Sequence, residues 1–178
     1  QELGMTNVKF QSMEDLRDIE SFNVEQYLKA RHIPRFIRWN MIKAVTRDHM
    51  RTPMQWSENT ESDFTTGKPW IELNENFREI NCSKQKLDEN SVLNYYKKLI
   101  KLRNENEIFI YGDYQKHQIT SKIFVFERFN GNSSYLVLIN LSRRKVKVKE
   151  KGKVILGNYN RDIFNGLLAP YEAIILKQ

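Results

Sequence analysis

Cysteine is nearly absent from this sequence of 178 residues, and histidine is scarce. The single cysteine, Cys82, excludes an internal disulfide and favours a reducing compartment, so we expect a cytoplasmic protein. The three histidines and one cysteine lack the spacing of zinc ligands, and neither a metal site nor a cofactor is predicted. Apolar runs are too short to cross a membrane, and residues 1–5 lack the basic and apolar regions of a secretory signal.

Positive charge is in excess, with a formal net charge of +7. A nucleic-acid-binding protein is one interpretation of that excess. However, lysine and arginine are spread along the whole chain, with only short runs such as 143–145, and no known nucleic-acid-binding motif accompanies them. We therefore favour a solvated basic surface, and we expect neither a nucleic-acid nor a membrane partner.

The first half of the chain combines helical and irregular patterns. Residues 24–46 predict a helix in two pieces, because Pro34 lacks an N–H group and disfavours helical dihedrals at Ile33. Residues 47–81 lose regular periodicity but keep aromatic side chains, which predicts an ordered, irregular segment. We expect its larger rings to pack beneath the segment rather than to stack on sugars: Trp56, Phe64 and Trp70.

The second half begins with the clearest helix and continues with short strands. Residues 90–104 carry one apolar stripe, and Asp88 or Asn90 is expected to cap the start of this helix. After residue 105, short apolar runs alternate with turn signals such as Asn130-Gly131-Asn132, which favours an antiparallel sandwich. The predicted strands are 108–111, 123–128, 135–141, 146–149, 154–156 and 173–176.

A series of blocks, in order along nearly the whole chain, resembles one enzyme family. The most distinctive block is RDHMRTPMQW at 47–56. The others are QELGMTN at 1–7, RDIES at 17–21, FTTGKPW at 64–70, EIN at 79–81, YYKKLI at 95–100 and PYEA at 170–173. The chain resembles the C-terminal part of glycoside hydrolase family 13, in particular oligo-1,6-glucosidases, α-glucosidases and trehalose-6-phosphate hydrolases.

The resemblance implies an α+β fold in two parts. Residues 1–104 would form the C-terminal remnant of a (β/α)8 barrel, namely the loop after strand eight and the last helix. Residues 105–178 would form an antiparallel β-sandwich domain. Active sites of such barrels lie on the loops that follow the strands, which would account for the long irregular segment.

The resemblance also implies a retaining α-glucosidase acting on short oligosaccharides. Such chemistry needs two closely spaced carboxyl groups. In the family these acids precede the position that matches Gln1, so we expect no catalytic residue in this chain and no activity from it alone. A separate acid pair among Glu14, Asp15, Asp18 and Glu20 is the less favoured reading, because caps and solvated faces often cluster carboxylates. A trehalose-6-phosphate hydrolase fragment and a non-catalytic β module stay open as alternatives.

By the same resemblance, two residues are expected to bind substrate. Arg47 matches a family arginine that pairs with an aspartate from the barrel's N-terminal part and lines the pocket of the non-reducing glucose. Glu20 matches a family glutamate near the second sugar. Asp48 and Arg51 are expected to hold the loop together. The basic stretch 31–43 could meet a phosphorylated sugar, but a solvated helix face is the favoured interpretation.

Overall fold

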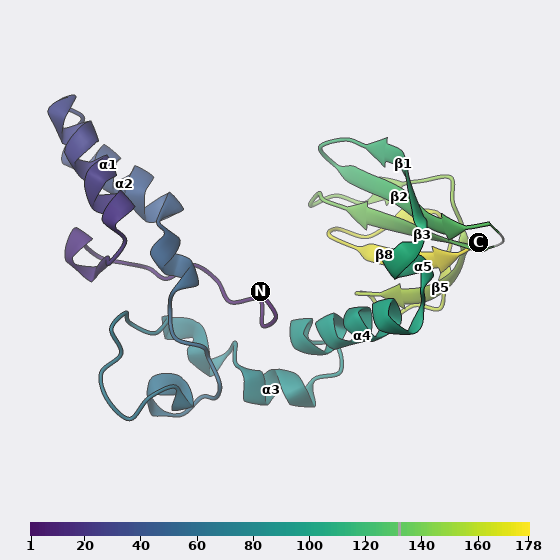
Figure 1. Cartoon of the computed structure of the whole chain (residues 1–178), viewed down its shortest axis with the longest axis horizontal. Helices are drawn as coiled ribbons and strands as arrows, with labels where there is room; N and C mark the ends of the chain where they lie inside the picture. The colour runs from purple at the N-terminus through teal and green to yellow at the C-terminus, as the bar shows by residue number, and fades with distance from the viewer. Residues whose placement is uncertain (132) are drawn as a thin grey trace. The chain divides into compact units, whose positions relative to one another are not determined.

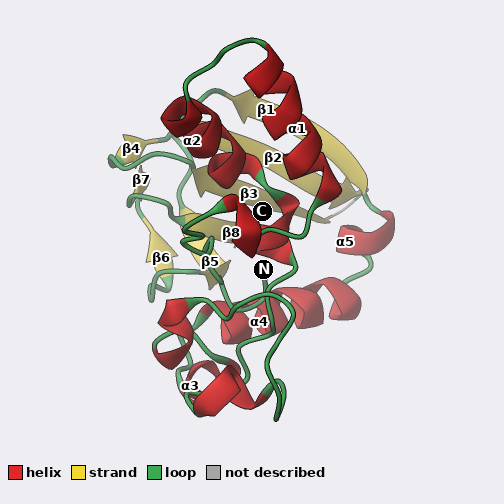
Figure 2. Ribbon diagram, turned by 90° about the vertical axis from the view of Figure 1, so that its left-hand side faces the viewer, coloured by secondary structure: helices red, strands yellow, loops and turns green. Residues whose placement is uncertain are grey.

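The computed structural model describes residues 1–131 and 133–178, with the side chains of residues 60 and 61 outside the description. The chain divides into two compact units, Gln1–Asn94 and Tyr95–Gln178. The first unit is helical and irregular, and the second is built on an antiparallel sheet (Figures 1 and 2). Each unit is described by itself.

Helices in the first unit are short and are joined by irregular segments. The α-helices are α1 (Ile19–Ala30), α2 (Arg35–Val45), α3 (Cys82–Leu87) and α4 (Val92–Glu105), which continues into the second unit. Helices α1 and α2 pack side by side as a hairpin (Figure 1). The 3-10 helices are η1 (Met13–Asp15), η2 (Arg47–Met50), η3 (Thr60–Asp63) and η4 (Glu75–Arg78).

The predicted break in the first helical region is confirmed, but its predicted start is wrong. Pro34 stands at the N-cap of α2, and His32 before it adopts a left-handed φ of 57°. The hairpin begins at Ile19 instead of residue 24, because the Asp18 side chain caps α1 by accepting from the backbone N–H of Glu20. Glu20 therefore lies in a helix rather than in a loop.

The irregular segment 47–81 is ordered largely by buried polar side chains. Gln55 and Asn81 are fully buried, and the Gln55 amide donates to the carbonyl of Ile80 at 2.8 Å. The expectation of packed rings is wrong, because the three aromatic side chains are about half exposed: Trp56 at 47%, Phe64 at 46% and Trp70 at 58%. Asparagine, glutamine and serine contribute most of the buried side chains there.

Two features near the end of the first unit differ from expectation. Helix α3 was not predicted, and Asn81 caps it by accepting from the backbone N–H of Lys84 at 2.9 Å. Helix α4 is present where it was predicted. Its start is capped by Ser91, whose hydroxyl accepts from the backbone N–H of Asn94 at 3.2 Å, rather than by Asp88 or Asn90. Ser91 is the better placed residue, because it stands three positions before that N–H.

The second unit contains a six-stranded antiparallel sheet in the order β1-β2-β3-β8-β5-β6 and a two-stranded ladder, β4-β7. The strands are β1 (Asp113–Ile119), β2 (Ile123–Asn130), β3 (Ser133–Asn140), β4 (Val146–Lys147), β5 (Gly152–Gly157), β6 (Ile163–Phe164), β7 (Leu167–Leu168) and β8 (Ala173–Lys177). Five predicted strands are confirmed to within a few residues. The predicted turn after β2 includes Asn132, which lies outside the described residues.

One predicted strand is wrong, and β1, β6 and β7 were missed. Residues Ile108–Tyr111 form a helical turn, α5, because the Glu107 carbonyl accepts from the N–H of Ile110 and of Tyr111. Gly112 allows the chain to turn from α5 into β1, since a Cβ there would lie 2.5 Å from the Ile108 carbonyl oxygen. Strand β1 has no apolar alternation, and every residue in it is exposed.

The two faces of the large sheet carry separate apolar clusters. One cluster combines alternate residues of β2, β3 and β8 with Phe164 and Leu168. The opposite face packs against Leu99 and Leu102 of α4 and against Ile108 of α5. Glu172 is completely buried at the start of β8, where it pairs with Arg161 at 2.9 Å. Burial on both faces explains why four consecutive residues of β3, Tyr135–Leu138, are buried.

Candidate functional site

A network of charged side chains joins the start of α1 to the end of α2. Asp18 is the N-cap of α1, and Glu20 lies in the first turn of that helix. Thr46 follows α2 and caps η2, which places Arg47 and Asp48 at the start of that short helix. The hydroxyls of Ser21 and Thr46 lie 2.9 Å apart and tie the two helix ends together. Local capping therefore brings residues nearly thirty positions apart into one site.

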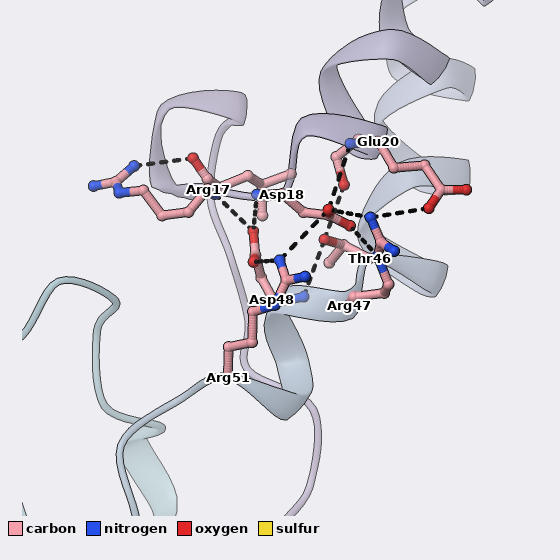
Figure 3. A network of polar contacts seen from close by, with 9 residues as sticks. Arg17, Asp18, Glu20, Thr46, Arg47, Asp48 and Arg51 are labelled. Carbon is pink, nitrogen blue, oxygen red and sulfur yellow. Dashed lines mark hydrogen bonds and ion pairs between the residues drawn. The ribbon is translucent and has the colours of Figure 1, made fainter.

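Arg47 is the centre of this network (Figure 3). Its Nη2 donates to Oδ1 of Asp18 at 2.6 Å, and its Nε donates to Oδ2 at 2.9 Å. The same Nη2 lies 3.1 Å from Oε2 of Glu20. A guanidinium that hydrogen-bonds both oxygens of one carboxylate is held in one orientation, and it stays positively charged. The arrangement therefore orients Arg47 between one buried and one exposed carboxylate.

Asp48 contacts the backbone next to Asp18 and the side chain of Arg51 (Figure 3). It is completely buried, and its Oδ2 accepts from the backbone N–H groups of Arg17 at 2.6 Å and Asp18 at 2.9 Å. Its Oδ1 accepts from Nη1 of Arg51 at 3.0 Å, and the same Nη1 lies 3.4 Å from Asp18. Asp48 and Arg51 thus fix the backbone that presents Asp18.

The charged side chains of the network differ in their exposure to solvent. Asp18 is 3% exposed, whereas the side chains of Arg47 and Glu20 are 47% and 63% exposed. Hydrogen bonding from Arg47 lowers the pKa of Asp18 to about 2, while burial acts in the opposite direction. Asp18 is therefore ionised at neutral pH, and Arg47 and Glu20 keep surface available for a ligand.

A hollow of about 280 Å³ opens beside this network. Its charged wall consists of Asp18, Glu20 and Arg47, and its apolar wall consists of Val24, Ile42 and Val45. Hydroxyl groups of a ligand could donate to the carboxylates and accept from the guanidinium, while carbon faces meet the apolar wall. The arrangement suits binding of a polyhydroxylated molecule, and its carboxylates are held by arginines rather than paired for acid–base work.

Comparison with known proteins decides the family. The family model described as "Alpha amylase, catalytic domain" matches residues 1–112, which is more than half of the chain. This chain belongs to the alpha-amylase family. The prediction of glycoside hydrolase family 13 is therefore confirmed, and the family and its curated relatives are glycoside hydrolases.

Individual relatives in the alpha-amylase family match almost the whole chain. An oligo-1,6-glucosidase of Bacillus cereus is 37% identical, and the match covers 99% of this chain and 34% of that protein. A trehalose-6-phosphate hydrolase of Bacillus subtilis is 34% identical with the same coverage of both chains. Among solved structures, isomaltulose synthase of Klebsiella sp. LX3 superposes with a TM-score of 0.91 at 31% identity, again over 99% and 34%. The chain spans about a third of the length of these relatives.

Within this family member, the four predicted site residues come together. Arg47, Glu20, Asp48 and Arg51 all belong to the network, and the sequence reasoning missed the group that joins them, Asp18. An aspartate directly before an apolar helical run is a capping signal, and that signal was available in the sequence. Arg47 was expected to pair with an aspartate from another part of the barrel. Within the described residues it pairs with Asp18 and Glu20.

The described residues add two further observations. None of their helices combines the length and apolar character needed to cross a membrane. They also contain no group of three or more His, Cys, Asp or Glu side chains placed to hold a metal ion.

Proposed function

We propose that this chain supplies the Arg47 side of the sugar pocket in a retaining α-glucosidase that acts on short oligosaccharides. The observation that carries the proposal is the two-point Arg47–Asp18 pair beside a hollow, in a member of the alpha-amylase family. Arg47 would contact the hydroxyls of the non-reducing glucose, and Glu20 would accept from those of the next sugar. Asp48 and Arg51 would keep the loop in place.

We propose that the chain consists of two parts of such an enzyme. Residues 1–104 would be the C-terminal remnant of the (β/α)8 catalytic barrel, and 105–178 would be its antiparallel β-sandwich domain. The family match through residue 112 and the change from helices to strands after α5 support a boundary in this region. Apolar clusters on both faces of the large sheet support a layered domain, with the β4-β7 ladder as part of the second layer.

We further propose that the chain alone does not hydrolyse glycosides. The carboxylates beside the hollow are occupied by Arg47 and Arg51, so none of them is placed as a free nucleophile or proton donor. The catalytic acids would come from the remainder of the barrel. The cytoplasm is the proposed location, because a chain with one cysteine has no need of an oxidising compartment.

Hydrolysis of trehalose 6-phosphate is the second candidate, since one relative carries that name at 34% identity. The basic stretch 31–43 is the feature that would favour it. Two of its cations are already engaged, because Arg38 is hydrogen-bonded to Glu25 at 2.9 Å and Arg31 lies 3.6 Å over the Tyr27 ring. A solvated and partly paired helix surface therefore remains the favoured interpretation of that stretch, and neutral oligosaccharides remain the first proposal.

A chimaera tests the proposal directly. Residues 1–178 replace the matched third of the Bacillus cereus oligo-1,6-glucosidase, and hydrolysis of isomaltose, maltose and trehalose 6-phosphate is measured. We expect isomaltose hydrolysis by the chimaera and no hydrolysis of p-nitrophenyl α-glucoside by the chain alone. A folded but inactive chimaera would refute the assigned role, and turnover by the isolated chain would refute the proposed dependence on the barrel. Preference for trehalose 6-phosphate would favour the second candidate.

A further inference from the structure

Three neighbouring strands of the large sheet change from apolar to polar side chains along one face. Side chains two positions apart on a strand share a face. On β2, buried Val125 is followed on its face by Glu127. On β3, Ser134 lies two positions before buried Leu136, and Gln178 lies two positions after buried Leu176 of β8. The apolar cluster therefore ends in a stepped polar row, one pair earlier on β2, where Glu127 lies opposite Leu136, than on β3 and β8.

This polar row borders a hollow of about 320 Å³, which we call the polar cup. Its side chains come from four segments adjacent in the sheet order and include Gln115, Glu127, Phe129, Ser133, Ser134 and Gln178. Gln115 pairs directly across from Glu127, and the backbone N–H of Gln178 donates to the Ser134 carbonyl at 3.0 Å. The strand ladders thus fix where these side chains stand.

Glu127 is held in place at the centre of the cup. Its Oε2 lies 2.9 Å from Nε2 of His117, a residue at the irregularity of β1. Hydrogen bonds from Ser134 and His117 lower the pKa of Glu127. The side chain is 20% exposed, so the carboxylate is fixed by its partners and still reaches the hollow. A positioned acceptor of this kind can select among ligand hydroxyls.

The charge of the cup excludes an anionic ligand. The whole chain carries +7, yet neither lysine nor arginine is among the described residues that line the cup, and Glu127 is their one ionisable side chain. A phosphate group would meet a carboxylate, with no lysine or arginine among these lining residues to compensate its charge. Amide and hydroxyl groups beside an aromatic ring instead match a neutral sugar, which offers hydroxyls at its edge and C–H groups on its faces. The volume is at the lower end of ligand-sized hollows.

We propose that the polar cup is a second carbohydrate site, separate from Arg47, that binds one or two neutral sugar units without cleaving them. Glu127 and Gln115 hydrogen-bond the hydroxyls, and Phe129 contacts a sugar face. Such a site would retain an oligosaccharide on the β domain between catalytic events.

The test is an NMR titration of the full ¹⁵N-labelled chain with isomaltose. We expect saturable shifts of the Gln115, Ser133 and Ser134 amides with a Kd in the range of about 1 mM or weaker. Gln115→Ala and Phe129→Ala should each weaken binding about tenfold, which corresponds to roughly one lost contact. Gln118→Ala is the matched control, because Gln118 is an exposed residue of the same strand outside the cup. Glucose should shift the same amides, and glucose 6-phosphate should not.

Three results would overturn the proposal: no saturable shift, equal binding by Gln115→Ala, or stronger binding of glucose 6-phosphate than of glucose. Gln115 is exposed, so its substitution leaves the fold intact even where Phe129→Ala does not. Only the choice of isomaltose as probe rests on the proposed function. If the chimaera is active but the polar cup binds no sugar, only the proposed second site is refuted. If the polar cup binds sugar but the chimaera is inactive, only the proposed role of Arg47 is refuted.

Discussion

Both carboxylate oxygens of Asp18 are hydrogen-bonded by the guanidinium of Arg47, at 2.6 Å and 2.9 Å. Asp18 is buried and Arg47 is half exposed, so the pair has one fixed partner and one partner that faces the hollow. The pair also joins the N-cap of α1 to the first residue of η2. Arg47 is thus both a structural tie and the group best placed to meet a ligand.

Replacing Arg47 by lysine in the chimaera should lower kcat/KM for isomaltose about 100-fold. An ammonium cannot bond both oxygens of Asp18 and reach Glu20 with one planar group. Steady-state kinetics measures the effect, and Arg103→Lys, at an exposed position in the last turn of α4, serves as the matched control. Unchanged kcat/KM in the Arg47 variant would contradict a role of the guanidinium in the sugar pocket.

Truncating Asp48 to alanine should lower the free energy of unfolding of the first unit by about 3 kcal/mol, because two backbone N–H groups and Arg51 lose their acceptor. Urea unfolding followed by tryptophan fluorescence reports on this unit, since all three tryptophans lie within residues 39–70. Glu72→Ala removes an exposed carboxylate of the same unit and should change stability by less than about 0.5 kcal/mol. Equal effects of the two substitutions would show that the Asp48 contacts contribute little.

Acid should weaken the first unit through Asp18. Its folded pKa of about 2 lies below the ordinary aspartate value, so folding favours the ionised form. The resulting stabilisation is complete above the unfolded pKa of about 4 and is lost as the pH falls toward 2. The same unfolding measurement on Asp18→Asn should give a stability difference that is constant above about pH 5 and shrinks below pH 4. A difference independent of pH down to 2 would rule out this titration.

Amide hydrogen exchange should be faster in residues 1–81 than in residues 107–178. The first unit has one small apolar cluster, centred on Phe10, Leu16, Ile42 and Ile71, while the second has a cluster on each face of its sheet and continuous strand ladders. Sparse apolar packing lowers the free energy of local opening. Mass spectrometry of peptides measures the difference. Equal protection of the two regions would contradict the view that residues 1–81 depend on missing barrel structure.

Patterns carried by local chemistry were predictable from the sequence. Pro34 divides the helical region because it cannot donate a backbone hydrogen bond, and that holds in any context. Alternation along β2 and β3 likewise predicts strands that face a core. The predicted strand at 108–111 is wrong because four apolar residues carry no usable period, and the chain turns into β1 only at the following Gly112.

Other features depended on contacts between distant residues. β1 is polar and fully exposed, so only its pairing with β2 makes it a strand. The role of Asp18 depends on Arg47, which is 29 positions away. The polar cup exists because β2, β3 and β8 pair in a register that brings the polar ends of their apolar rows side by side.

The sequence by itself determined the family, the helix break at Pro34 and most of the strands, because these follow from residue types over short distances. Tertiary structure decided which carboxylate meets Arg47, where one face of the sheet becomes polar, and that the aromatic rings of the irregular segment stay half exposed. The physical reason is that ion pairs, hollows and burial are properties of side chains brought together from distant positions, and chain order alone does not specify those distances.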